Sequence, residues 1–180
     1  MAVYTDVSPE ELEAFLSTYE LGRLRAFKGI AEGVENSNYL LQTEAGSFIL
    51  TLYEKRVNPA DLPFFIGLME HLAKRGIDCP QPVRNRDGVA LGTLAGRPAL
   101  IATFLVGTSV RRPTAANCAA LGAALAGLHK AGADFSEFRR VNALSVAGWR
   151  PLHEQARERA DTVAPGLAAL IADELSVLEE

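Results

Sequence analysis

Three features are scarce in this sequence: cysteine, long apolar runs and clusters of basic residues. Its two cysteines, Cys79 and Cys118, match no metal-ligand spacing, and no secretory signal is recognisable. We therefore expect a protein of the reducing cytoplasm rather than a disulfide-stabilised secreted domain. No apolar run reaches the roughly 18 residues of a membrane helix, so we expect no membrane partner. The basic clusters are the pairs at 111–112 and 139–140, which are too short for the basic stripe of a nucleic-acid-binding protein.

What the sequence does contain is enough apolar material for a folded protein. Of its 180 residues, 48% are hydrophobic, and the net charge is −4. This composition allows one sizeable core or two small lobes that share a cleft, and it excludes a mainly disordered chain.

A glycine-containing loop at residues 29–38 joins two segments with the pattern of β-strands. Residues 39–43 are short and mainly apolar, the turn at 44–46 ends in the glycine that a hairpin needs, and residues 48–53 resume the strand pattern. A Walker-type phosphate loop would instead lead into a helix and carry a Gly-Lys-Ser/Thr triplet. A glycine hairpin between two strands indicates the flexible cover that lies over the phosphates in kinase-like lobes.

The order of the predicted elements divides the chain into two parts. A helix with an N-cap at Ser8 is followed by strands and one further helix, all within residues 1–105. In residues 106–180 the strand pattern stops and alanine-rich helical patterns follow, the first of them capped by Thr114. We predict an α+β fold in which a five-stranded antiparallel sheet with helices precedes the start of a helical region.

Four motifs carry a resemblance to a known family. They are Gly-Val-Glu-Asn-Ser-Asn-Tyr at 33–39, Leu-Pro-Phe-Phe at 62–65, Leu-His-Lys-Ala-Gly-Ala-Asp-Phe at 128–135 and Gly-Trp-Arg-Pro-Leu at 148–152. In this order they resemble the aminoglycoside-phosphotransferase-like kinases, and most closely the homoserine kinases of that superfamily. The second and fourth motifs look specific to homoserine kinases.

The resemblance implies a protein-kinase-like fold. Residues 1–105 would form its nucleotide-binding N-lobe, and residues 106–180 the connector and the first helices of a C-lobe. It also implies ATP and Mg²⁺ as cofactors, L-homoserine as the partner substrate, and transfer of a phosphoryl group to its side-chain hydroxyl, a step of threonine biosynthesis.

Five residues of the loop are candidate phosphate contacts. Gly29 and Gly33 allow close backbone approach and positive φ, and the short polar side chains of Asn36, Ser37 and Asn38 can reach phosphate oxygens together with backbone N–H groups. The alternative is an ordinary hairpin, in which the Asn-Ser-Asn run only satisfies the turn.

The resemblance also assigns candidates for the adenine and for the acceptor. Kinases bind adenine through main-chain groups of the interlobe connector, which implies the C=O of Thr103 and the N–H of Leu105; alternatively this strand end contacts nothing. Trp149 and Arg150 are candidates for the homoserine pocket, because a guanidinium group suits the carboxylate of an amino acid. Alternatively, Trp149 only packs between structural elements and Arg150 is solvated.

This sequence lacks an ion pair that is typical of the wider superfamily. Its third strand carries a Lys or Arg that contacts the phosphates and pairs with a glutamate on the next helix, but this sequence has Thr51 and Phe65 there. It makes physical sense that both members are missing together, since a buried glutamate without its cationic partner would destabilise the fold by about 3–5 kcal/mol. Lys28, Lys55 or Arg56 could approach the phosphates instead, although charged residues at strand ends are usually solvated.

The transfer motif of the superfamily, His-x-Asp-x-x-x-x-Asn, and its second metal-binding aspartate do not occur in the sequence. We expect His71 and His153 to be exposed and His129 to pack or cap a helix; no other cluster has metal-ligand spacing. We therefore assign no catalytic and no metal-binding residue and expect the Mg²⁺ ligands outside this chain. Losing a general base lowers a rate by about 10²- to 10⁴-fold, so we expect no measurable transfer by this chain alone.

Two other functions stay open. A kinase for another small amino alcohol, such as an aminoglycoside or choline, would keep the fold but would require a strongly acidic second lobe. A non-catalytic nucleotide-binding module would explain the missing transfer motif. Because residues 106–180 would hold only the first helices of an incomplete C-lobe, the apolar stripes on these helices would have too few partners, which predicts self-association through them.

Overall fold

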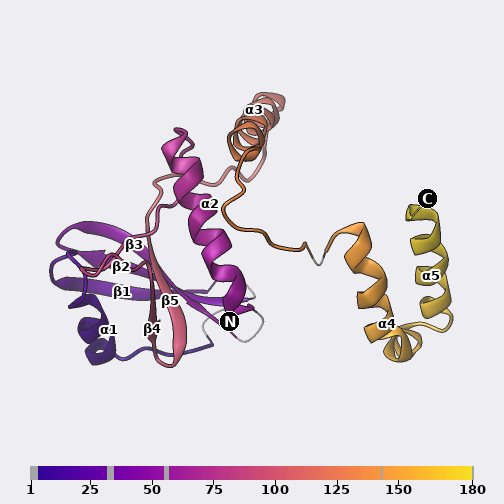
Figure 1. The fold of residues 1–180 in the computed structure, drawn as a ribbon, viewed down its shortest axis with the longest axis horizontal. Helices are drawn as coiled ribbons and strands as arrows, with labels where there is room; N and C mark the ends of the chain where they lie inside the picture. The colour runs from indigo at the N-terminus through magenta and orange to yellow at the C-terminus, as the bar shows by residue number, and fades with distance from the viewer. Residues whose placement is uncertain (1–3, 32–34, 55–56, 143, 180) are drawn as a thin grey trace. The chain divides into compact units, whose positions relative to one another are not determined.

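The computed structural model describes residues 4–31, 35–54, 57–142 and 144–179. Packing divides the chain into two units, residues 1–138 and 139–180 (Figure 1). The first unit contains, in chain order, α1 Pro9–Leu16, β1 Leu24–Ile30, β2 Asn36–Thr43, β3 Gly46–Tyr53, a 3₁₀ turn Pro59–Asp61, α2 Leu62–Lys74, β4 Leu91–Leu94, β5 Arg97–Thr103 and α3 Ala115–Gly132. The second unit contains α4 Val146–Val163 and α5 Leu167–Leu178.

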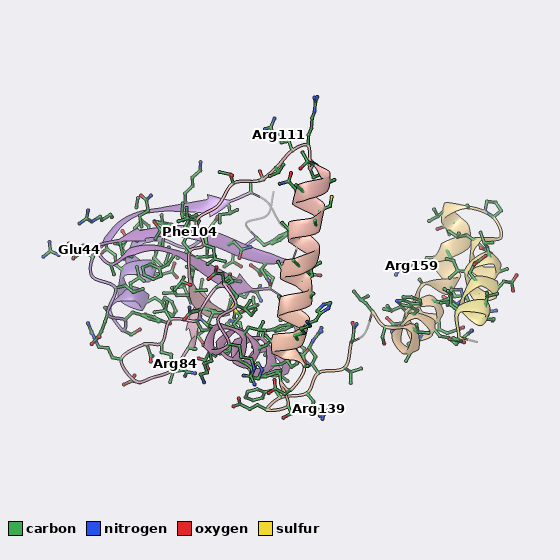
Figure 2. All side chains as sticks on the ribbon, turned by 90° about the horizontal axis from the view of Figure 1, so that it is seen from above. Glu44, Arg84, Phe104, Arg111, Arg139 and Arg159 are labelled. Carbon is green, nitrogen blue, oxygen red and sulfur yellow. The ribbon has the colours of Figure 1, made fainter. Side chains whose placement is uncertain are left out.

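The five strands form one antiparallel sheet in the order β1-β2-β3-β5-β4, which confirms the predicted sheet and its opening meander. β2 and β3 pair without a break from Asn36 opposite Tyr53 to Thr43 opposite Gly46. Gly46 has a φ of 133°, which a residue without Cβ can adopt in this tight turn. Glu44 lies at the tip of the same hairpin, beyond the ends of β2 and β3 (Figure 2).

One face of the sheet is covered by α1 and holds the core of the first unit. α1 begins, as predicted, at a capping box: Ser8 Oγ accepts from the Glu11 N–H at 3.2 Å, and the Glu11 carboxylate accepts from the Ser8 N–H at 3.0 Å. This second bond lowers the pKa of Glu11. The core combines α1 with alternate strand residues, among them Leu12, Leu16, Tyr19, Tyr39, Leu41, Leu50, Leu52 and Ile101. The intervening strand residues therefore lie on the opposite face of the sheet.

Helix α2 is held by the last residues of α3 and the segment that follows them, together residues 131–138. The rings of Phe64 and Phe135 meet edge to face with centroids 5.5 Å apart, and Arg75 forms an ion pair with Asp134. Two motifs noted in the sequence, Leu-Pro-Phe-Phe and the one that ends in Asp-Phe, therefore pack against each other.

Helix α3 begins, as predicted, at Thr114, whose Oγ1 accepts from the Asn117 N–H at 3.3 Å. None of its 18 residues, all of which the structure describes, is buried. Leu121, Leu125 and Leu128 expose 62%, 47% and 38% of their surface. In the described ranges, no helix is both long and apolar enough to cross a bilayer.

The second unit is a pair of helices that lie side by side (Figure 1). His153 is buried between them, with Nε2 2.9 Å from the carbonyl oxygen of Ala168. The prediction that His153 is exposed is wrong, because its partner lies 15 residues away and on another helix. His71, which we also expected to be exposed, is partly buried, with 18% of its side chain exposed.

The main difference from the predicted boundaries concerns β1 and β2. β2 starts at Asn36, three residues before the predicted start at Tyr39, and β1 continues through Gly29. The polar Asn-Ser-Asn run lacks the apolar alternation by which a half-buried strand is recognised. It is nevertheless part of the strand because β3 offers paired backbone groups along its whole length.

Candidate functional site

A cavity of about 300 Å³ lies at the root of the glycine loop, on the face of the sheet opposite α1. The pairing of Lys28 with Leu40 and of Leu40 with Ile49 places these residues on that face. The cavity is lined by Lys28, Gly29, Ile30, Ala31, Leu40 and Phe104. It thus lies between the β1–β2 hairpin and the residue that follows β5, where the resemblance places the nucleotide; that a nucleotide binds there stays a prediction. Larger hollows of about 900 Å³ between α4 and α5 and 680 Å³ beside α1 involve neither segment.

Phe104 is the connector residue of this cavity. It directly follows β5, is 42% exposed and lies beside the sheet (Figure 2). Together with Ile30 and Leu40 it gives the cavity apolar walls, which suit a flat heteroaromatic ring.

Asn38 and Thr51 face each other across β2 and β3 on the cavity side of the sheet. The Thr51 hydroxyl donates to Asn38 Oδ1 at 2.8 Å. Thr51 therefore links the two strands; that it occupies the position of the superfamily's cation stays a prediction. Among the described residues that line the cavity, Lys28 supplies the positive charge; Lys55 and Arg56 lie outside the described residues.

The structure separates the five predicted loop contacts. Gly29 lines the cavity, and Gly33 lies outside the described residues. Strand alternation puts Asn36 and Asn38 on the cavity side and Ser37, which is fully buried, on the α1 side. Asn36 Oδ1 is buried and has no hydrogen-bond partner among the described residues. Whether these five residues bind phosphate stays a prediction.

The predicted adenine contacts lie at the end of β5. The Thr103 N–H donates to the Gln81 carbonyl oxygen at 2.9 Å, and the Gln81 N–H donates to Thr103 Oγ1 at 2.9 Å. Two bonds therefore fix the start of the connector, while Leu105 is 48% exposed. The adenine contacts of Thr103 C=O and Leu105 N–H stay a prediction.

The predicted acceptor residues lie in the second unit. Trp149 Nε1 donates to the Leu144 carbonyl oxygen at 2.8 Å. Arg150 donates through Nε and Nη2 to the Glu179 carboxylate at 2.8 and 2.7 Å. Hydrogen bonding to this guanidinium lowers the pKa of Glu179. Arg150 already binds a carboxylate within the chain, and its role toward homoserine stays a prediction.

Sequence reasoning missed the apolar walls Ile30, Leu40 and Phe104. The signal was available in part: once β2 is extended back to Asn36, alternation places Leu40 opposite the core residues. Phe104 could not be placed in this way, because its position depends on β5 entering the sheet next to β3. No group of three or more His, Cys, Asp and Glu side chains within the described ranges could hold a metal ion.

Comparison with solved structures identifies the fold as that of kinase-like phosphotransferases, as predicted. A spectinomycin phosphotransferase, solved in complex with ADP and spectinomycin, matches with a TM-score of 0.63 at 15% identity, over 86% of this chain and 47% of that chain. An aminoglycoside phosphotransferase from Alicyclobacillus acidocaldarius matches with a TM-score of 0.58 at 14% identity, over 97% of this chain and 54% of that chain. At such identities the likeness shows the fold alone.

Sequence comparison then gives the family. Residues 26–180 match the phosphotransferase enzyme family, and the chain belongs to that family. It is similar to the homoserine kinases of Xanthobacter autotrophicus, at 69% identity, and of Azorhizobium caulinodans, at 68%, in each case over 99% of this chain. The chain spans 56% of the length of each of these curated relatives.

Proposed function

We propose that the chain is the nucleotide-binding part of an ATP-dependent homoserine kinase, which phosphorylates the side-chain hydroxyl of L-homoserine in threonine biosynthesis. The observation that carries the proposal is the 69% identity to the homoserine kinase of Xanthobacter autotrophicus over 99% of the chain. The cavity between the glycine hairpin and the connector supports it, because kinase-like folds bind nucleotide in that place.

In this proposal, residues 1–105 form the nucleotide lobe, and residues 106–180 form the connector and the first helices of the second lobe. The adenine ring lies between Leu40 and Phe104, with its edge toward the main chain of Thr103 and Leu105. The phosphates extend toward the loop and its flanking residues Gly29, Gly33, Asn36, Ser37 and Asn38. A cavity of about 300 Å³ with three apolar walls fits the purine, while the exposed phosphates need the cover that the loop provides.

Magnesium would neutralise charge on the phosphates, as it does in related phosphoryl transfer. The described residues offer no matching set of ligands, and the sequence lacks the His-x-Asp-x-x-x-x-Asn motif. We therefore expect this chain to bind ATP but to transfer no phosphoryl group on its own.

Nucleotide binding can be tested with a pair of variants on β2. Leu40→Trp fills the cavity and should weaken binding of a fluorescent ATP analogue by at least about tenfold, equivalent to about 1.4 kcal/mol. Gln42→Trp puts the same ring on the same face but outside the cavity lining, and it should leave the affinity unchanged. Equal affinities for the two variants would show that the nucleotide binds elsewhere.

The acceptor can be tested with a chimera, since the identity to the Xanthobacter autotrophicus enzyme is high. The 180 residues would replace the matching part of that enzyme, and ATP consumption would be measured with homoserine, spectinomycin and choline. We expect turnover with homoserine only. Turnover with another amino alcohol in its place would contradict the proposed substrate.

We also propose a cytoplasmic location. Both cysteines are free, and Cys118 is exposed, as is usual for proteins of a reducing compartment. Burial and then the neighbouring Asp78 raise the pKa of the Cys79 thiol, so this side chain is a weak nucleophile. Recovery of the native protein in the cell envelope after fractionation would contradict this location.

A further inference from the structure

Ser37 is the second residue of β2 and follows the glycine loop closely, yet it faces away from the cavity. Its side chain is fully buried. It lies on the same face as Tyr39 and Leu41, which belong to the core beneath α1, whereas Leu40 lines the cavity. A hydroxyl in this position does not contact a nucleotide in the cavity directly.

The Ser37 hydroxyl instead joins three parts of the chain. It accepts from the Tyr4 N–H at 2.8 Å and from the Thr5 N–H at 3.1 Å, and it donates to Glu54 Oε1 at 2.7 Å. A hydroxyl has one proton to donate and two lone pairs, so its bonding capacity is fully used. Residues 4–7, which we call the N-terminal strap, are held further by the Tyr39 hydroxyl, which donates to the Thr5 carbonyl oxygen at 2.6 Å.

The network continues from Glu54 to β5, the strand next to β3 in the sheet. Glu54 directly follows β3 and has 10% of its side chain exposed, and its Oε2 lies 3.1 Å from Arg97 Nε on β5. The charge of Glu54 is thus paired with Arg97 and its carboxylate is hydrogen-bonded by Ser37.

These contacts lie where β2 begins, directly after the glycine loop that joins β1 to β2. Asn36, the first residue of β2, pairs with Tyr53, the last residue of β3, and Ser37 and Glu54 are the next residues along. Ser37 and Glu54 thus fix the point at which the chain returns from the loop into the sheet. The shape of a loop that binds through backbone N–H groups depends on how its ends are fixed.

We propose that Ser37 is a positioning residue for the phosphate end of the nucleotide site: with Glu54 and the N-terminal strap it fixes the start of β2, to which the chain returns from the β1–β2 loop, and thereby supports phosphate binding. This rests on the proposed function, because it presupposes that the loop covers ATP. In this proposal the Ser37 hydroxyl does not contact phosphate directly; it acts by fixing the backbone next to the loop. It also makes residues 4–7, far from the loop in sequence, part of the nucleotide site.

The test compares the loss of two buried hydroxyls on the same strand and face. Ser37→Ala removes the one near the loop. Thr43→Val removes the one at the far end of β2, where Thr43 Oγ1 accepts from the Ala45 N–H at 3.2 Å. Both variants should melt at lower temperature, since both lose a buried hydrogen-bonded group. Affinities for ATP and for adenosine would then be measured by competition with a fluorescent ATP analogue, at a temperature where all proteins are folded.

We expect Ser37→Ala to weaken ATP binding by about five- to tenfold, and adenosine binding by less than about twofold, because adenosine has no phosphate for the loop to hold. Thr43→Val should leave both affinities unchanged. A second variant keeps Ser37 and deletes residues 1–6; it should show the same selective loss of ATP affinity, whereas deletion of residues 1–3 should not. The deletion variant decides the matter if Ser37→Ala does not fold.

The outcomes separate this inference from the proposed function. Equal effects of Ser37→Ala and Thr43→Val on ATP affinity, or an equal loss of ATP and adenosine binding, would overturn the positioning role and leave the nucleotide site standing. An unchanged chain that binds neither ATP nor adenosine would overturn both.

Discussion

The sheet and helix α3 contain similar apolar side chains but use them in opposite ways. Leu41, Leu50 and Leu52 on the strands are completely buried beneath α1, whereas α3 buries none of its residues within the described part of the chain. The free energy that stabilises the first unit therefore comes mainly from the core face of the sheet. The comparison teaches that an apolar stripe predicts which face of an element seeks a partner, but not whether the chain in hand supplies one.

Truncation of one leucine in each region tests this difference between the sheet and α3 most directly. Leu50→Ala removes a fully buried side chain and should lower the free energy of unfolding by about 3 kcal/mol. Leu125→Ala, at a site that is 47% exposed, should change it by less than about 0.5 kcal/mol. Amide hydrogen exchange of the slowest β3 protons would measure both changes. Similar losses for the two variants would mean that α3 is packed as tightly as the sheet.

Replacing glycine by alanine gives a second contrast: the expected changes in stability are smaller than for Leu50→Ala, and they have opposite signs in α2 and α3. An added Cβ at Gly67 on α2 would lie 2.8 Å from ring atoms of Phe138, but at Gly122 on α3 it would meet nothing within 4 Å. Replacing glycine by alanine gains up to about 1 kcal/mol of helix propensity, while overpacking costs typically ~1–3 kcal/mol. Gly122→Ala should therefore raise the melting temperature and Gly67→Ala should lower it. Thermal unfolding followed by circular dichroism measures both, and a gain in both variants would show that the Phe138 ring moves freely.

The exposed leucines of α3 predict that copies of the chain associate with one another. The double variant L121Q/L125Q should reduce the binding of a hydrophobic dye and shift any oligomer toward monomer, because it replaces two exposed apolar side chains of α3 by polar ones. Val163→Gln on α4 is the control, since Val163 is 80% exposed and lies outside this stripe. Sedimentation velocity and dye fluorescence would report the change. An unchanged chain that is a monodisperse monomer without dye binding would count against an exposed patch on α3.

The smallest expected effect concerns the surface of the second unit. Arg150→Gln should raise the pKa of Glu179 toward its ordinary value, because hydrogen bonding and charge pairing with Arg150 now lower it. A carboxyl with a lowered pKa stabilises the fold above its unfolded pKa and loses that contribution as the pH falls through its folded value. A carbonyl-detected NMR titration of Glu179 measures the shift; Arg157→Gln, which leaves Arg150 in place, serves as the control. A pKa of Glu179 that stays low in Arg150→Gln would mean that another group holds the carboxylate.

Local chemistry made much of the fold predictable. The caps at Ser8 and Thr114 form as expected because the capping side chain and its backbone partner are three residues apart. The first three strands follow from their apolar alternation and from the Gly46 turn. The predicted strand missed its polar start at Asn36, because pairing with β3 overrides a weak local preference there.

The site was predictable only where its parts are close in sequence. The glycine hairpin could be placed at the cavity, but the choice between Ser37 and its neighbours depends on strand phase, and a shift of one residue reverses every side chain. Residues fixed by distant partners were out of reach. Thr103 is held by Gln81, 22 residues away, and Glu54 is held by Arg97 on the neighbouring strand β5.

The N-terminal strap also constrains the order in which the fold can be completed. Its bonds to Ser37 and Tyr39 span 32 to 34 residues of sequence, and Ser37 is held in turn by Glu54 after β3. Residues 4–7 are made before these partners, so their hydrogen bonds to Ser37 and Tyr39 can form only once β2 has been synthesised. The N-terminal strap, although it leaves the ribosome first, therefore gains these hydrogen-bond partners only later.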